Sequence, residues 1–258
     1  MSAAELLGLI AAAAAAGLIN AVAGGGTLIT FPTLLLFGIA SKTANATSTL
    51  ALVIGTFGGV FGFRRQVAAV KPWLRRLIPP SLVGGALGGW LLKNTSDQVF
   101  SKLVPFLILF ATLLFLAQGL IKRWSGAAPA GGTGPGAGAV VGAVLFQFGV
   151  AVYGGYFGAG IGILMLASLG LMGLRDIHEM NALKTILASL INLVASALFI
   201  AAGLIDWPRA GIMTVGALAG YFVGSHYSQK IPQARVRQIV TAIGLLIAAV
   251  SFWKEFLR

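Results

Sequence analysis

The sequence has no cysteine and very little charge. The absence of cysteine excludes disulfide bonds, thiolate metal sites and thiol redox chemistry. Only six acidic residues and two histidines occur among 258 residues, which leaves little material for hydrolytic catalysis. Charged residues make up 9% of the chain and hydrophobic residues 58%, so the polar residues are too few to cover a water-soluble fold. These deficits predict an integral membrane protein.

The chain has long apolar stretches instead, and its mean hydropathy is +0.94. Several of them reach the roughly 20 residues that a helical span needs. They are apolar on every side and do not alternate, which favours helices over the strands of a membrane barrel. We therefore predict an all-α polytopic membrane protein. The apolar stretches lie near 3–22, 27–40, 46–63, 77–92, 99–121, 138–157, 159–174, 180–202, 210–228 and 236–253.

The formal net charge of +12 comes from basic residues in the short loops beside these stretches. Contact with lipid headgroups and orientation in the membrane explain this placement better than nucleic-acid binding. We expect membrane lipid as a partner and no nucleic acid.

One glycine-broken apolar segment occurs twice, once in each half of the chain. The first copy contains AVAGGGTLITFP and the second contains GGYFGAGIG. When Gly24 is aligned with Gly158, a shift of only two residues also brings Asn45 onto Asn181. A duplicated break within membrane-length sequence is typical of the substrate site of a transporter.

The two copies belong to two predicted repeats, 1–122 and 138–258, which are joined by a linker at 123–137 that is rich in glycine and proline. Lysine and arginine gather around Trp73 in the first repeat. In the second repeat they are sparse around the matching Trp207 and gather at the following loop instead. Because cytoplasmic loops collect basic residues, this opposite bias predicts repeats of inverted topology.

Inversion requires an odd number of crossings in each repeat, and two arrangements meet that condition. If each break joins two short crossings, the chain has ten spans. If each broken segment turns back as a re-entrant hairpin, the chain has six spans plus two hairpins. A hydropathy count that merges each broken pair gives eight segments. The pieces beside the breaks, about 14 to 18 residues long, are short for full spans, and the sequence leaves the alternatives open.

The break glycines predict an anion site. Glycine lets the backbone leave helical geometry and lets a ligand approach closely. A helix that begins just after a break points unpaired N–H groups and about half a positive charge toward it, so two such helices would form an anion-binding site. Close helix packing is the alternative for membrane glycines. We assign the glycines at 84–89 and 216–224 to packing because they repeat at four-residue spacing.

Polar residues open the helix that follows each broken segment. Asn45 and Ser48 share a helix face in the first repeat, and Asn181 and Lys184 share one in the second. A lysine at mid-membrane costs about 2.5 to 3.5 kcal/mol unless it is paired or reaches outward, and an anionic substrate would pair with it. Helix capping by the asparagines and an outward-reaching Lys184 are the alternative explanations.

These motifs resemble the TauE/SafE sulfite exporter family, also called the sulfonate uptake permease family. The resemblance rests on the two broken segments, on ATS at 46–48, RR at 64–65 and IDW at 205–207, and it covers nearly the whole chain. It implies a multi-pass bacterial inner-membrane carrier of sulfur-containing anions such as sulfite and organosulfonates. The second copy departs from the pattern, with Leu183 and Lys184 in place of the threonine and serine of the first.

The sequence thus predicts a secondary transporter that moves a small sulfur-containing anion by alternating access, with an anion channel of the same architecture as the alternative. No enzymatic activity, cofactor or metal is expected. The coupling ion, a proton or Na⁺, and the oligomeric state stay open; His178 and Glu179 are the candidates for proton coupling. The predicted substrate-binding residues are Asn20, Gly24, Gly25, Gly26, Thr27, Asn45, Thr47 and Ser48 from the first repeat, and Tyr156, Gly158, Gly160, Asn181, Lys184 and Asn192 from the second.

Overall fold

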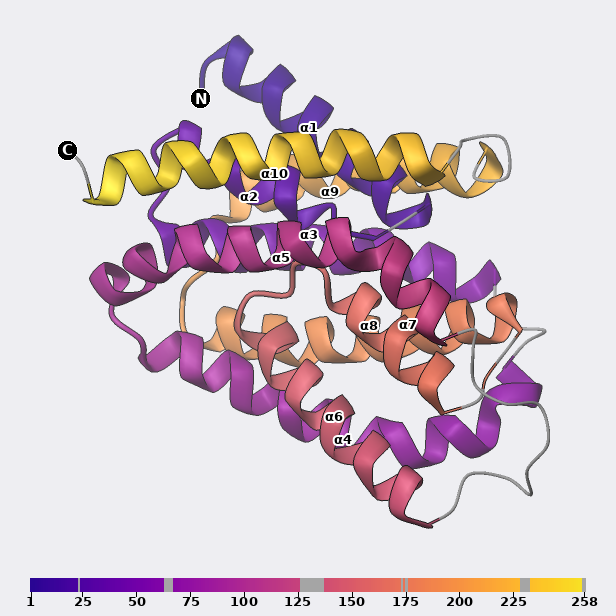
Figure 1. The fold of residues 1–258 in the computed structure, drawn as a ribbon. Helices are drawn as coiled ribbons and strands as arrows, with labels where there is room; N and C mark the ends of the chain where they lie inside the picture. The colour runs from indigo at the N-terminus through magenta and orange to yellow at the C-terminus, as the bar shows by residue number, and fades with distance from the viewer. Residues whose placement is uncertain are drawn as a thin grey trace.

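The computed structural model describes residues 1–22, 24–62, 67–125, 137–172, 174, 176–227 and 233–256. This part of the chain is entirely helical and contains no strand (Figure 1). The helices are α1 (Ala3–Val22), α2 (Thr27–Leu36), α3 (Ser41–Gly62), α4 (Val67–Asn94), α5 (Asp97–Ser125), α6 (Ala137–Tyr156), α7 (Ile161–Leu171), α8 (Ile177–Ala201), α9 (Trp207–Tyr227) and α10 (Gln233–Phe256). Most of the predicted linker and the arginine pair at 64–65 lie outside the described residues.

Helix length separates the elements into two kinds. In the described part of the chain, three helices contain a stretch long and apolar enough to cross a membrane: Ala3–Ala21, Asp97–Ala117 and His178–Ala201. By contrast, α2 and α7 have 10 and 11 residues, which is about 15 Å of helix. That length is roughly half of the 30 Å hydrocarbon core of a bilayer.

The short helix α2 runs back along α1. At the start of α2, a Cβ atom on Gly26 would lie 2.9 Å from the Cβ of Ala16. At its other end, a Cβ on Gly8 near the start of α1 would lie 2.9 Å from the ring of Phe37. The two helices are therefore antiparallel, and α1 and α2 form a hairpin whose turn is the first glycine break.

Glycine residues on one side of α9 and on one side of α4 bring two pairs of helices into close contact, α1 with α9 and α4 with α6. On α9, a Cβ on Gly220 would lie 2.6 Å from the carbonyl carbon of Ala14, and one on Gly224 would lie 2.8 Å from the Cα of Leu18. On α4, a Cβ on Gly88 would lie 2.7 Å from the backbone nitrogen of Tyr156. These helices pack backbone to backbone, as small residues allow in membrane proteins. The assignment of these glycines to packing is confirmed.

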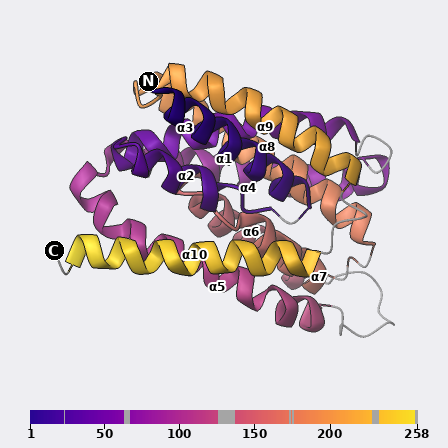
Figure 2. The same cartoon turned by 90° about the horizontal axis from the view of Figure 1, so that it is seen from above.

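The helices of the two halves interlock. Helix α1 packs most extensively against α9, and α6 packs most extensively against α4. In the same way, α3 packs against α9 as α8 packs against α4, and α2 packs against α10 as α7 packs against α5. In each case the two contacts are related by a shift of five positions in the order of the helices. Figure 2 shows α1 beside α9, and α10 beside α5.

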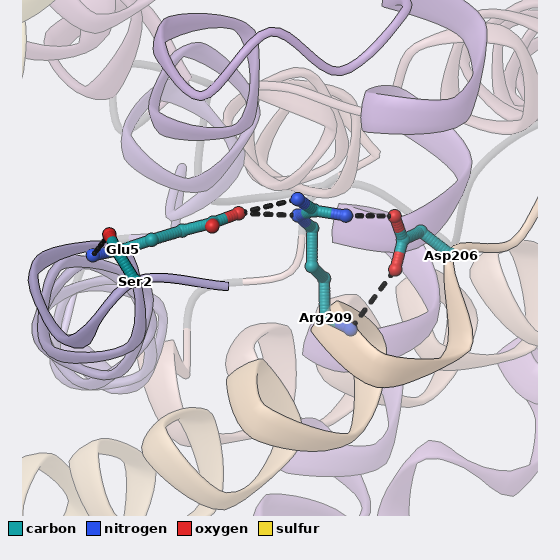
Figure 3. A network of polar contacts seen from close by, with 4 residues as sticks. All are labelled: Ser2, Glu5, Asp206 and Arg209. Carbon is teal, nitrogen blue, oxygen red and sulfur yellow. Dashed lines mark hydrogen bonds and ion pairs between the residues drawn. The ribbon is translucent and has the colours of Figure 1, made fainter.

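A polar network ties α1 to α9 where both helices begin (Figure 3). The guanidinium of Arg209 forms ion pairs with Glu5 at 2.6 Å and with Asp206 at 2.5 Å. The backbone N–H of Asp206 donates to the hydroxyl of Thr47 on α3 at 3.0 Å. The starts of α1, α3 and α9 are thus held together at one end of the molecule.

Candidate functional site

Both glycine breaks leave helical geometry as the sequence predicts. The φ angles are 79° at Gly24, 96° at Gly25, 83° at Gly158 and 80° at Gly160. This left-handed region is open to glycine at little cost, whereas a side chain would be strained there. The backbone therefore turns at equivalent places in the two halves.

The helices on either side of each break end and begin in the same way. The N–H of Gly24 donates to the carbonyl of Ile19, and the N–H of Gly158 donates to the carbonyl of Tyr153, each five residues back. The N-cap of the following helix is a glycine in both halves, Gly26 for α2 and Gly160 for α7. Glycine has no side chain to accept from the first-turn N–H groups. Those of Leu28, Ile29 and Ile163 instead donate to the backbone carbonyls of Gly25, Gly26 and Gly160, so the two helix starts offer an anion mainly the positive ends of their dipoles.

A cavity lies between the two breaks, with about 80 Å³ of room for the centres of water-sized molecules. It is bounded by both broken segments, by α3 and α8, and by one residue of α9. The lining residues are Asn20, Gly24, Gly25, Thr27, Thr49, Leu52, Thr56, Gly158, Gly160, Ile161, Gly162, Lys184, Thr185, Ala188, Ser189, Asn192 and Tyr221.

Part of the predicted residue set lines this cavity and part of it does not. Both breaks reach the cavity, and so do the polar residues beside the first break and along α8. The predicted residues that line it are Asn20, Gly24, Gly25, Thr27, Gly158, Gly160, Lys184 and Asn192. Asn20 also has a local role, because its side-chain oxygen accepts from the N–H of Gly26 at 2.8 Å.

Three predicted residues on α3 lie outside the lining because they bind neighbouring helices. The side-chain nitrogen of Asn45 donates to the carbonyl of Tyr156 at 3.1 Å. The hydroxyl of Thr47 accepts from the N–H of Asp206. The hydroxyl of Ser48 is 2.6 Å from that of Thr30 on α2. All three are buried, and they hold α3 against α6, α9 and α2.

The remaining predicted residues are not part of the cavity lining. Gly26 caps α2, and the hydroxyl of Tyr156 donates to Thr95 at 3.4 Å, away from the break. Asn181 contacts the cavity only through Lys184, whose ammonium donates to its side-chain oxygen at 3.0 Å. His178 and Glu179 lie in the first turn of α8, where their N–H groups bind Asp176.

Sequence reasoning missed the face of α3 that meets the cavity. Thr49, Leu52 and Thr56 lie there, and the seven-residue spacing of the two threonines, which puts them on one helix face, was a usable signal. Thr185 and Ala188 were missed as well.

The lining residues of α3 and α8 occupy matching positions. Thr49 matches Thr185, Leu52 matches Ala188 and Thr56 matches Asn192, each pair separated by the same number of residues as Asn45 and Asn181. Lys184 and Ser189 of α8 and Tyr221 of α9 have no matching partner in the lining.

Lys184 is the one lining residue with a charged side chain. Its stem passes over Gly162, where a Cβ would lie 3.1 Å from the Cδ of the lysine. Within the described residues, which include all six acidic side chains, the ion pairs are those of Arg209. The ammonium of Lys184 thus faces hydroxyls, amides and backbone without a neutralising carboxylate, an arrangement that attracts an anion in a low-dielectric setting.

Known proteins support a membrane transporter. The family model "Sulfite exporter TauE/SafE" matches residues 9–251. A "Probable membrane transporter protein" of Haemophilus influenzae is 27% identical over 93% of this chain and 91% of its own length. The "Probable membrane transporter protein YfcA" of Escherichia coli K12 is 28% identical over 91% of this chain and 84% of its own length. No solved structure matches. The chain therefore belongs to the TauE/SafE family of membrane transporters and is a multi-pass protein of the bacterial inner membrane.

Proposed function

We propose that this protein is a secondary transporter that carries a sulfur-containing anion, of the sulfite or organosulfonate class, between its two glycine breaks. The observation that carries the proposal is the ammonium of Lys184 in a cavity whose other polar groups are uncharged. The description of the matching family as a sulfite exporter supports the sulfur oxyanion.

The chemistry of the lining suits an oxyanion. The ammonium supplies charge and the hydroxyl of Thr27 supplies a donor. The hydroxyls of Thr49 and Thr56 donate to the carbonyls of Asn45 and Val53 within α3. The starts of α2 and α7 add the positive ends of two helix dipoles. Each oxygen of a sulfite or sulfonate group accepts several hydrogen bonds, so donors converging from several elements bind it well.

The paired helix contacts and the matched lining positions support inverted repeats and alternating access. Most of the extensive contacts between elements have a counterpart at a shift of five helices, which is the relation that two similar repeats would produce. The reversal of α2 along α1, and the half-bilayer length of α2 and α7, argue against ten full spans, because a helix of 10 or 11 residues does not cross the bilayer. Motion of one repeat against the other would then expose the site to each side in turn.

A binding and flux experiment on Lys184 tests the proposal. Purified protein is titrated with sulfite, sulfate, sulfoacetate and taurine, and the Lys184→Gln variant is compared with Lys102→Gln, which removes an exposed lysine outside the cavity. We expect Lys184→Gln to weaken anion binding by at least about tenfold, because hydrogen bonds to charged groups contribute about 1.5 to 3 kcal/mol. Lys102→Gln should bind normally.

Counterflow in proteoliposomes distinguishes the carrier from the channel. A carrier shows saturable flux that is accelerated by anion on the opposite side, whereas a channel gives unitary currents without counterflow. Equal anion affinity in wild-type and Lys184→Gln protein would contradict the assignment of the cavity as the substrate site.

A further inference from the structure

Two buried side-chain amide oxygens have no hydrogen-bond partner within the described residues, those of Asn45 and Asn192. Asn192 lines the cavity. Asn45 does not line the cavity, and its side chain is only 1% exposed. An acceptor buried without a donor is costly, so the oxygen of Asn45 calls for a ligand of its own.

The orientation of the Asn45 amide follows from its chemistry. Its nitrogen donates at 3.1 Å to the carbonyl of Tyr156, the last residue of α6. Turning the amide over would set an oxygen against that carbonyl oxygen, which is repulsive. The unpartnered atom is therefore the oxygen, and it lies at the C-terminal end of α6. That end of a helix carries about half a negative charge.

The equivalent residue in the second half shows what such an oxygen binds. Asn181 aligns with Asn45, and its side-chain oxygen accepts from the ammonium of Lys184 at 3.0 Å. In the first half, the position of Lys184 is held by Ser48, whose hydroxyl binds Thr30. In the second half, a lysine side chain thus supplies a cation to the oxygen of Asn181. In the first half, no side chain supplies one to the oxygen of Asn45.

A neighbouring helix end shows the same pattern. Lys42, one turn before Asn45 on α3, donates its ammonium at 3.0 Å to the carbonyl of Lys93 in the last turn of α4. The start of α3 therefore faces two helix C-termini. The partial negative charge at the end of α4 is neutralised by the ammonium of Lys42. The end of α6 receives a hydrogen bond from the uncharged amide of Asn45.

From these contacts we infer that the side-chain oxygen of Asn45 and the carbonyl end of α6 bind a monovalent cation, Na⁺, from solution. Carbonyl and amide oxygens are ligands that hard cations prefer, and the C-terminal ends of broken helices bind Na⁺ in inverted-repeat transporters. Because Asn45 binds the last residue before the second glycine break, a cation there would hold the α6 end of the break in place. A role for Na⁺ in coupling anion transport rests on the proposed function, whereas the binding of Na⁺ does not.

Binding of ²²Na⁺ to the purified full-length protein, in choline chloride without sulfur anions, tests the site. We expect saturable binding that Asn45→Ala weakens by at least about tenfold, since a charged interaction is lost. Lys102→Gln, which removes an exposed lysine outside the cavity, is the control and should bind Na⁺ as the wild type does. No saturable binding would overturn the inference and leave water as the partner of Asn45. Unchanged affinity in Asn45→Ala, or selective binding of K⁺, would overturn it as well.

A second variant covers the case in which Asn45→Ala does not fold. Asn45→Asp keeps the size of the side chain, replaces the donor to the Tyr156 carbonyl by a second oxygen and adds a negative charge that a bound cation would offset. It should therefore tighten Na⁺ binding several-fold, a change that a merely structural residue would not produce. Looser or unchanged binding would contradict the site. The two proposals fail separately: if Na⁺ binds but no sulfur anion does, the proposed function is wrong and the cation site stands. If anions bind through Lys184 but Na⁺ does not, only the cation site is wrong.

Discussion

The two halves of the chain reach the central cavity with matching backbone and with different side chains. Thr49 and Thr185 occupy matching places in the lining, and Gly24 and Gly158 turn with nearly the same φ. One residue before these threonines the halves diverge, because Ser48 is buried against Thr30 while Lys184 lines the cavity.

This difference separates what the fold requires from what the ligand requires. Left-handed turns and close helix contacts depend only on the absence of a Cβ atom, so both halves keep glycine there. In the proposed function, charge needs to be placed only once, because a single ammonium pairs with a single anionic group, and a second ammonium would add repulsion within the cavity. Comparing equivalent positions therefore distinguishes residues that build the fold from residues that we propose to bind the anion.

The largest effect should come from the glycine contacts between the halves. Gly220→Ala would push a Cβ into the backbone of Ala14, and Gly88→Ala would push one into the backbone at Tyr156. We expect each to destabilise the protein by about 2 to 3 kcal/mol, the usual cost of overpacking a tight contact, measured by thermal unfolding in detergent. Gly211→Ala on the same helix as Gly220 has nothing within 4 Å of its Cβ and is the control. If Gly220→Ala left the stability unchanged while Gly88→Ala lowered it, the contact of α1 with α9 and the contact of α6 with α4 would not be equivalent.

The break glycines should affect binding as well as stability. At Gly24 a Cβ would meet nothing within 4 Å, so Gly24→Ala acts through its positive φ alone. We expect a loss of about 1 to 2 kcal/mol in stability together with weaker anion binding, because the turn that presents the start of α2 would relax. Gly203→Ala is the matched control, since Gly203 has a φ of 68°, is equally open, and does not line the cavity. If both variants bind the anion as the wild type does, the first break does not contact it.

The sequence was sufficient for features that depend on one residue type. Gly24, Gly25, Gly158 and Gly160 could be identified as breaks because they are clustered glycines inside apolar helices. Lys184 could be singled out because a charge in an apolar helix is costly wherever the helix points. The structure places these residues at the cavity.

The rotation of α3 about its axis was not accessible from the sequence. Its first turns are polar on several sides, so Asn45, Thr47 and Ser48 looked as suitable for a ligand as Thr49 and Thr56. Which side meets the cavity is decided by α2, α6 and α9, whose groups bind the first three residues. Contacts that join residues so far apart in the chain leave no local pattern.

The smallest effect concerns the starts of α3 and α8, where only the second half has an acidic cap. The N–H groups of Glu179 and His178 donate to the exposed carboxylate of Asp176 and lower its pKa, whereas the matching position before α3 is Ala40. A lowered folded-state pKa contributes stability above the unfolded-state pKa that is lost as the pH falls through the folded-state pKa, here below roughly pH 4. Hydrogen exchange, corrected for intrinsic rates, should show protection fading at the start of α8 and not at the start of α3. Asp176→Asn, which keeps an acceptor that does not titrate, should remove this pH dependence, and a wild-type α8 start that is equally protected at pH 3 and pH 6 would refute it.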